Sequence, residues 1–285
     1  MSKFIKEKKI AVIVLMVISI AGTTSCKQQT EKKETLNTKV NLKTAKKSND
    51  YMIMSVLFHQ YAAEYKALCY QAFNMAKMKV DKDIVNNNLK GRKKAIILDI
   101  DETILDNSPH QAKCILDTIN YPAKWNEWCE MAIAEPLPGA VEFLNYAVSK
   151  GIEIFYISNR KEKQIQATMK NLIDKGFPMV DLQHLLFKKD KDKNSSKESR
   201  RNVVEKNYYV IAYLGDNLAD FSKLYDNTSR DRRNNVTDSI NKDFGSKFIV
   251  LPNAMYGDWE MALYEKNDST ADLKAKRHRE LLKSF

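Results

Sequence analysis

The sequence predicts an α/β fold, with a mainly parallel sheet that carries helices on both faces. Two observations predict it. Short apolar runs alternate along the chain with stretches whose apolar residues recur at helical spacing, and several of the runs end in polar residues. Strands that alternate with helices form parallel sheets whose connections cross the faces. With 285 residues, 44% of them hydrophobic, the chain can bury the core of one such domain.

Five short apolar runs predict the strands of this sheet. Each run is continuous rather than alternating, which is typical of strands buried on both faces. The runs lie at residues 93–100, 152–158, 184–187, 209–215 and 247–252.

Helices are expected before and between these strands. Apolar residues at helical spacing, without Gly or Pro, predict one long amphipathic helix over residues 51–78. Gly151 and Gly176 are expected to end two further helices, and Ser195 or Ser196 to cap a third. The later helices are expected at residues 140–151, 163–175, 195–206 and 270–283.

Two stretches interrupt this regular order. The aromatic-rich segment between the first strand and the helix at 140 is too long for an ordinary connection, so it predicts a small cap inserted at about 106–138. The second stretch, 225–243, is expected to be irregular. The letters RDRRNN within it, at 230–235, are interpreted as a solvated turn, with phosphate-rich or subunit contacts as the alternative.

The N-terminal residues predict export. Four lysines precede the apolar run 10–21, which is too short to span a bilayer comfortably but fits a signal peptide. Cys26 follows small residues, as in a bacterial lipobox, although Thr23 stands where such motifs carry Leu. We therefore expect a lipoprotein signal peptide at 1–26, a polar flexible tether at 27–50 and the folded domain at 51–285. Simple secretion or an uncleaved anchor is the alternative.

Net charge argues against a nucleic-acid polymer as partner. The formal charge is +11, but residues 1–50 hold eleven lysines against four acidic residues, which leaves only +4 for residues 51–285. Cys69, Cys114 and Cys129 form no CxxC or zinc-like spacing, so they are expected to be buried small hydrophobes.

Polar residues end three of the predicted strands. Asp99 and Asp101 follow the first, Ser158, Asn159 and Arg160 the second, and Asp216 and Asp220 a later one. Ligands bind beyond the carboxyl ends of parallel strands, so these side chains are expected to meet. Crowded carboxylates repel one another unless a cation is present, and Mg²⁺ prefers oxygen ligands.

The spacing of Asp99 and Asp101 suits phosphoryl transfer. One carboxylate can attack phosphorus to form an acyl phosphate, and the other can move the proton of the leaving group and of water. Lys197, at the start of a predicted helix, would supply positive charge.

These motifs together resemble a known family. DIDETILDNSP, SNR, SSKESRR and GDNLADF look like the four motifs of the haloacid dehalogenase (HAD) superfamily of phosphatases. The leader cysteine, DNSP and LPNAMYGDWE resemble the class C acid phosphatases, bacterial outer-membrane lipoproteins that act as 5′-nucleotidases. The resemblance covers residues 50–285. It implies a HAD-like Rossmannoid three-layer sandwich with a small, mostly helical cap, and Mg²⁺ as cofactor.

The resemblance also implies roles for individual residues. Asp99 would be the nucleophile and Asp101 the general acid and base. Lys188 and Lys189 are alternatives to Lys197 as the third catalytic residue. Ser158 could instead cap a helix, and Arg160 could be a surface charge. Metal ligands would be Asp99, Asp101 through its carbonyl, Asp216 and, in support, Asp220; phosphate would be bound by Thr103, Ser158, Asn159 and Arg160.

Nucleoside monophosphates are the expected substrates. In the resembling family the base stacks between aromatic rings, for which Tyr256 and a cap residue, Tyr121 or Trp125, are candidates. The expected function is a lipid-anchored, Mg²⁺-dependent phosphomonoesterase of the bacterial cell envelope, at the outer membrane, which meets the membrane through its N-terminal anchor. A homodimer is left open. The alternatives are a phosphatase for sugar or other small organic phosphates, and a surface binding or storage lipoprotein without turnover.

Overall fold

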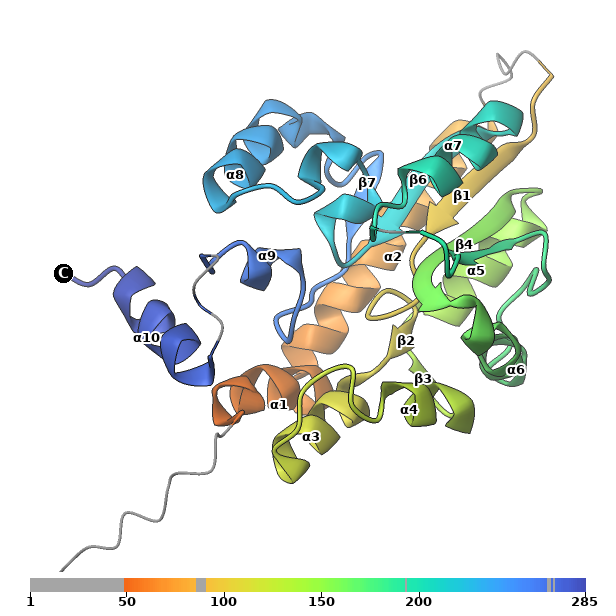
Figure 1. Cartoon of the computed structure of the whole chain (residues 1–285). Helices are drawn as coiled ribbons and strands as arrows, with labels where there is room; N and C mark the ends of the chain where they lie inside the picture. Colours follow the sequence, from red (N-terminus) through yellow and green to blue (C-terminus); the bar gives the residue numbers. More distant parts are fainter. Residues whose placement is uncertain (1–48, 86–90, 193, 266–267, 269) are drawn as a thin grey trace, which may run out of the picture. The chain divides into compact units, whose positions relative to one another are not determined.

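A five-stranded parallel sheet organises the structure. The computed structural model describes residues 49–85, 91–192, 194–265, 268 and 270–285 (Figure 1). Its strands pair in the order β5-β4-β1-β6-β7, with every neighbouring pair parallel, which confirms the expected sheet. The strands are β1 (Lys94–Leu98), β4 (Glu153–Lys161), β5 (Leu185–Lys188), β6 (Tyr209–Gly215) and β7 (Phe248–Val250).

Both faces of the sheet are buried, as the continuous apolar runs predict. In β1, Ile96 and Leu98 face one cluster of buried side chains, while Ala95 and Ile97 face the other. The first cluster includes residues of α2 (Ala63–Ile84) and α5 (Ala140–Ser149), and α6 (Ile165–Asp174) contributes Leu172. The second includes Val204 of α7 (Glu198–Asn207). Helices therefore cover both faces and give the expected three layers.

The first long helix is not continuous, contrary to the expectation for residues 51–78. A short 3₁₀ turn precedes α1 (Ile53–Tyr61), and Ala62 is extended, with ψ of 127°, before α2 begins. The break lets α1 pack against α3 (Ser108–Asp117), whereas α2 packs on α5 and the sheet. Tertiary packing decides this break, since no Gly or Pro marks it.

The cap is small and mostly helical. It consists of α3 and α4 (Trp125–Met131) between two short strands, β2 (Leu105–Asp106) and β3 (Glu135–Pro136). These two strands pair with each other antiparallel, so the insert leaves and re-enters the domain at one place. No helix among the described residues is long and apolar enough to cross a membrane. The predicted leader and most of the tether lie outside the described residues.

Residues 230–235 lie in a helix and do not form the expected turn. Residues Arg230–Ser239 form α8, which Ser229 caps by accepting a hydrogen bond from the Arg232 backbone N–H. Val236 is the only apolar residue of this helix, so no hydrophobic periodicity marked it. Two further helices follow β7, α9 (Asp258–Met261) and α10 (Ala271–Leu281).

The start of α7 also differs from expectation. The helix begins at Glu198 and Lys197 occupies the cap position, where its side chain makes no cap hydrogen bond. Ser196 Oγ still accepts from the backbone N–H of Glu198, at 3.3 Å. The cysteines are as expected, because Cys69, Cys114 and Cys129 are all buried and unpaired.

Candidate active site

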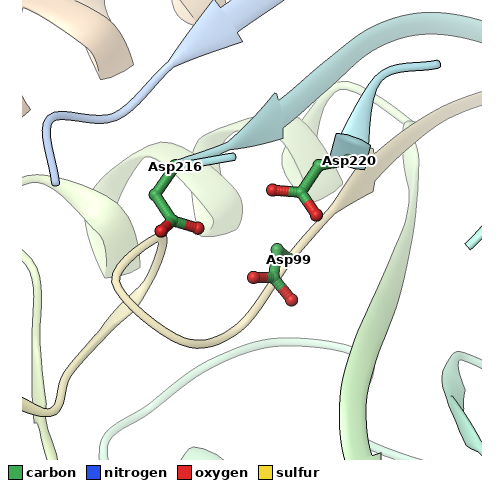
Figure 2. A group of neighbouring side chains, drawn as sticks. All are labelled: Asp99, Asp216 and Asp220. Atoms are coloured by element: carbon green, nitrogen blue, oxygen red, sulfur yellow. The ribbon is translucent and has the colours of Figure 1, made fainter. Parts of the chain in front are cut away.

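Three carboxylates meet at the carboxyl edge of the sheet. Asp99 directly follows β1, Asp216 directly follows β6, and Asp220 lies in the 3₁₀ turn Leu218–Asp220. One oxygen from each of the three lies within 4.8 Å of the others, and Figure 2 shows the three side chains side by side. The parallel order places β1 beside β6, so the ends of these two strands bring the acids together.

Lys197 lies among these carboxylates. Its Nζ is 2.6 Å from Asp99 Oδ1 and 2.6 Å from Asp220 Oδ1, and its side chain is 6% exposed. Burial alone would lower the pKa of Lys197, but the charges of Asp220 and Asp99 raise that pKa above its usual value. The lysine is therefore a buried ammonium held between two acids.

Gly215 makes the close approach of Asp220 possible. A Cβ atom at Gly215 would overlap the carboxylate and Cβ of Asp220. The end of β6 thus needs a residue without a side chain, because the acid folds back against it. Arg201 fixes the same turn, since Nη1 donates to the carbonyls of Ala219 at 2.7 Å and Asp220 at 2.9 Å.

One lysine does not balance three acids. Burial raises the pKa of Asp99, and the charges of Asp220 and Asp101 add to this against the lowering by Lys197. Burial also raises the pKa of Asp216 well above its usual value, with Asp220 and Asp99 adding to it. Such a surplus of buried negative charge on oxygen donors fits a divalent cation.

Asn253 and Thr103 both contact Asp216. Asn253 Nδ2 donates to Asp216 Oδ2 at 2.8 Å, and the hydroxyl of Thr103 accepts from the Asp216 backbone N–H at 3.1 Å. Thr103, which is fully buried, also lies 3.4 Å from Asp216 Oδ1. The predicted phosphate ligand Thr103 is therefore engaged with Asp216.

Asp101 has different partners from the other acids. Arg160 Nη2 donates to Asp101 Oδ1 at 2.7 Å, and Arg160 Nε lies 3.3 Å from Oδ2. Asn107 Nδ2 donates to Oδ1 at 2.9 Å, and the Ser158 hydroxyl lies 3.4 Å from Oδ2. Both carboxylate oxygens are thus oriented by donors.

Arg160 is not a surface charge. Its side chain is 1% exposed, and Nη1 donates to Thr168 Oγ1 at 3.0 Å. The guanidinium also lies over the ring of Trp125, 5.4 Å from the centroid. In the cap, Trp128 Nε1 donates to Asn107 Oδ1 at 2.7 Å. Cap residues therefore support the two side chains that hold Asp101.

Ser158 and Asn159, the other two residues of the SNR stretch, differ in their exposure to solvent. Ser158 is fully buried and its hydroxyl accepts from the Arg160 backbone N–H at 3.0 Å, so it caps no helix. Asn159 is exposed, with Nδ2 donating to the Ser195 carbonyl at 3.0 Å. Its Oδ1 accepts from Arg200 Nη2 at 2.6 Å.

Within the described residues, the rings of Tyr121 and Tyr256, the two predicted stacking residues, do not pack against each other. Tyr121 is 64% exposed and meets Trp125 edge-on, with centroids 5.9 Å apart. Burial and the charge of Asp101 raise the pKa of Tyr121. Tyr256 is partly exposed, and its carbonyl accepts from Trp259 Nε1 at 3.2 Å.

Sequence reasoning missed three supporting residues, Asn107, Arg201 and Asn253. Asn107 lies in DNSP, Arg201 in SSKESRR and Asn253 in LPNAMYGDWE. Only Arg201, four residues after Lys197, carried a signal, since it is a basic side chain on the same face of the helix as that lysine.

Comparison with known proteins decides the family. The family model described as "HAD superfamily, subfamily IIIB (Acid phosphatase)" matches residues 11–259. The chain belongs to this family. The resemblance drawn from the four motifs is thereby confirmed, and members of the HAD superfamily typically use a divalent metal, which the three-acid cluster of this subfamily IIIB protein could bind.

Solved structures agree with this assignment. A class C acid phosphatase from Bacillus anthracis is 43% identical to the subfamily IIIB chain, with a TM-score of 0.78, over 83% of this chain and 98% of that one. The same protein with tungstate bound gives 44% identity and a TM-score of 0.79, over 84% and 99%. Vegetative storage protein 1 of Arabidopsis thaliana is 29% identical over 178 residues. The match covers 60% of this chain and spans 61% of the length of that curated relative.

Proposed function

We propose that the chain is a Mg²⁺-dependent phosphomonoesterase that works through an aspartyl phosphate. The observation that carries the proposal is the contact of Lys197 with Asp99, inside a buried cluster that also holds Asp216 and Asp220. A buried ammonium beside an attacking carboxylate can bind a phosphoryl group and offset its charge. Asp99, Asp216 and the carbonyl of Asp101 would hold Mg²⁺, with Asp220 in support. The ion would supply further neutralisation of phosphoryl charge.

Asp99 and Asp101, which follow β1, have different roles in the proposed reaction. A carboxylate oxygen of Asp99 attacks phosphorus, the bond to the ester oxygen breaks, and Asp101 gives its proton to that oxygen. A water molecule then attacks the same phosphorus and loses a proton to Asp101, which breaks the bond to Asp99 and releases phosphate. Arg160 and Asn107 hold Asp101 in one orientation, so we assign them a positioning role.

The phosphate contacts follow from the same geometry. Lys197 reaches the cluster directly, whereas the side chain of Lys189 is exposed. Asn159 is exposed beside the start of α7 and can meet a phosphate oxygen. The donors of Arg160 are directed at Asp101, Thr168 and Asn107, so its effect on phosphate is indirect.

Nucleoside 5′-monophosphates are the proposed substrates. The exposed ring of Tyr121 next to Trp125, and Tyr256 in the loop after β7, supply aromatic faces for a base. Aromatic stacking tolerates every base and contributes about 1–3 kcal/mol per base. The predicted leader and lipobox add the proposal that the enzyme is exported and lipid-anchored at the bacterial outer membrane.

Storage without turnover is the second candidate, because one relative is a vegetative storage protein. A storage protein has no need of a buried lysine bound to two acids, so the site favours catalysis. The test is phosphate release from nucleoside monophosphates and sugar phosphates, by wild type, Asp99→Asn and the surface control Asp174→Asn. We expect Mg²⁺-dependent turnover, fastest with nucleotides, by wild type and Asp174→Asn only. Faster release from sugar phosphates would change the substrate class, and no release by wild type would favour storage.

A further inference from the structure

Helix α1 exposes an apolar stripe. Residues 54, 57, 58 and 61 follow one another at helical spacing and so share one face. The exposed fractions are 74% for Met54 and 79% for Tyr61, and Leu57 and Phe58 are also exposed. Val56 and His59 lie on the other side of the helix and are buried. Exposed apolar residues gathered on one face mark interaction surfaces more often than scattered ones do.

A basic helix, α10, lies beside the start of α1. The ring of Tyr51, in the 3₁₀ turn before α1, is 5.3 Å from the ring of His278 in α10, and α10 is drawn to the left of α1 in Figure 1. The segment 270–285 carries five basic residues against two acidic ones. Arg279 and Lys283 are exposed. We refer to the apolar stripe of α1 together with Arg279 and Lys283 as the α1–α10 face.

The remaining N-terminal chain joins the domain at the same place. Residues 1–48, which include the basic and apolar leader sequence, directly precede the first described residue, Asn49. The tether ends at the start of α1. A membrane that holds the N-terminal residues must therefore lie within the length of the tether from α1.

We propose that the α1–α10 face docks on the surface of a bilayer that contains anionic phospholipid. Apolar and aromatic side chains of an amphipathic helix enter the boundary between headgroups and acyl chains, and nearby basic residues are attracted to anionic headgroups. α1 itself contains no Lys, Arg, Asp or Glu, so its insertion desolvates no charge of its own. The inference extends the proposed lipid anchoring and is independent of catalysis.

The charges favour a bilayer over a second copy of the chain. A symmetric contact presents the same patch of both protomers to each other. Such a contact through this face would place the basic residues of both protomers in one interface, where like charges repel and no acidic surface is supplied by the face itself. An anionic surface complements both the apolar and the basic part of the face.

The test uses the full chain in vesicles whose acyl chains carry bromine, a short-range quencher of tryptophan fluorescence. Tyr61→Trp places a probe on the stripe, and Val203→Trp places a matched probe on α7, where Val203 is 57% exposed. Residues 1–48 are identical in both variants, so any attachment through them contributes equally. Unfolding curves by far-UV circular dichroism verify that both variants are folded.

We expect the added fluorescence of Tyr61→Trp to be quenched at least about twofold more than that of Val203→Trp. On vesicles with phosphatidylglycerol, Arg279→Glu combined with Lys283→Glu should remove much of this difference, whereas Lys163→Glu combined with Lys189→Glu should not. Equal quenching of both probes on vesicle-bound protein overturns the docking. Failure of the anchor is a distinct result, because both variants would then stay in solution. Dimerisation that Tyr61→Ser abolishes, together with equal quenching, would assign the face to self-association instead.

Discussion

Two nitrogens of Arg160 donate hydrogen bonds to the carboxylate of Asp101. Nη2 lies 2.7 Å from Oδ1, and Nε lies 3.0 Å from Oδ1 and 3.3 Å from Oδ2. The planar guanidinium matches both oxygens of a carboxylate, which a lysine ammonium cannot do. The proposed proton carrier thus has its orientation fixed by a buried side chain from the neighbouring strand.

Arg160→Lys should therefore impair the chemical step more than substrate binding. We expect kcat to fall about 10- to 100-fold, because a misplaced acid group loses alignment with the leaving oxygen, while KM changes little. Steady-state kinetics of Arg160→Lys and of its exposed neighbour Lys161→Ala measure this. A rise in KM at constant kcat would instead assign Arg160 to substrate binding.

Lys197→Met should remove activity, and Lys189→Met should not. The ammonium group of Lys197 contacts both Asp99 and Asp220, whereas Lys189 is exposed. Loss of one positioned donor typically costs 100- to 1,000-fold, so we expect about this fall in kcat. Equal activity of the two variants would show that another residue binds the phosphoryl group.

Gly215→Ala should destabilise the site through Asp220. The added methyl group overlaps the side chain of Asp220, and we expect a loss of about 1–3 kcal/mol in the free energy of unfolding. In a double-mutant cycle with Asp220→Gly, which also removes the overlapping Cβ, the penalty at Gly215 should nearly disappear, because the overlapping atoms are gone. Additive losses in urea unfolding would mean that the two residues do not interact.

The sheet and the main acids were predictable, and the supporting contacts were not. Continuous apolar runs mark strands buried on both faces, so the runs ending at Asp99 and Asp216 could be placed at one edge. The break at Ala62 depends on how α1 packs against the cap, and no local residue signals it. α8 carries too few apolar residues to show a period. The contacts of Arg160 and Asn253 join segments far apart in sequence, which spacing alone cannot reveal.

His59 should make the fold sensitive to acid. Its Nε2 accepts from the Ala254 backbone N–H at 3.2 Å, next to Asn253, which donates to Asp216. Burial lowers the pKa of His59 from 6.5 to about 4, so the folded protein favours the neutral ring. The unfolded chain takes up its proton near pH 6.5, before the folded one does. Stability is therefore fully present above pH 6.5 and is lost as pH falls toward 4.

The matched variant is His59→Gln, which has no titrating group at this position. Wild type should lose on the order of 2–3 kcal/mol more stability than His59→Gln between pH 7 and pH 4. Urea unfolding at several pH values measures the difference. Parallel pH profiles of the two proteins would show that His59 does not titrate differently on unfolding.

Trapping the phosphorylated enzyme tests the central claim most directly. Acid quenching of a turnover with ³²P-labelled nucleoside monophosphate, followed by peptide mapping, locates the covalent phosphate. We predict label on Asp99 in wild type and none in Asp99→Asn. Label on another residue, or label retained by Asp99→Asn, would contradict the assignment of Asp99 as nucleophile.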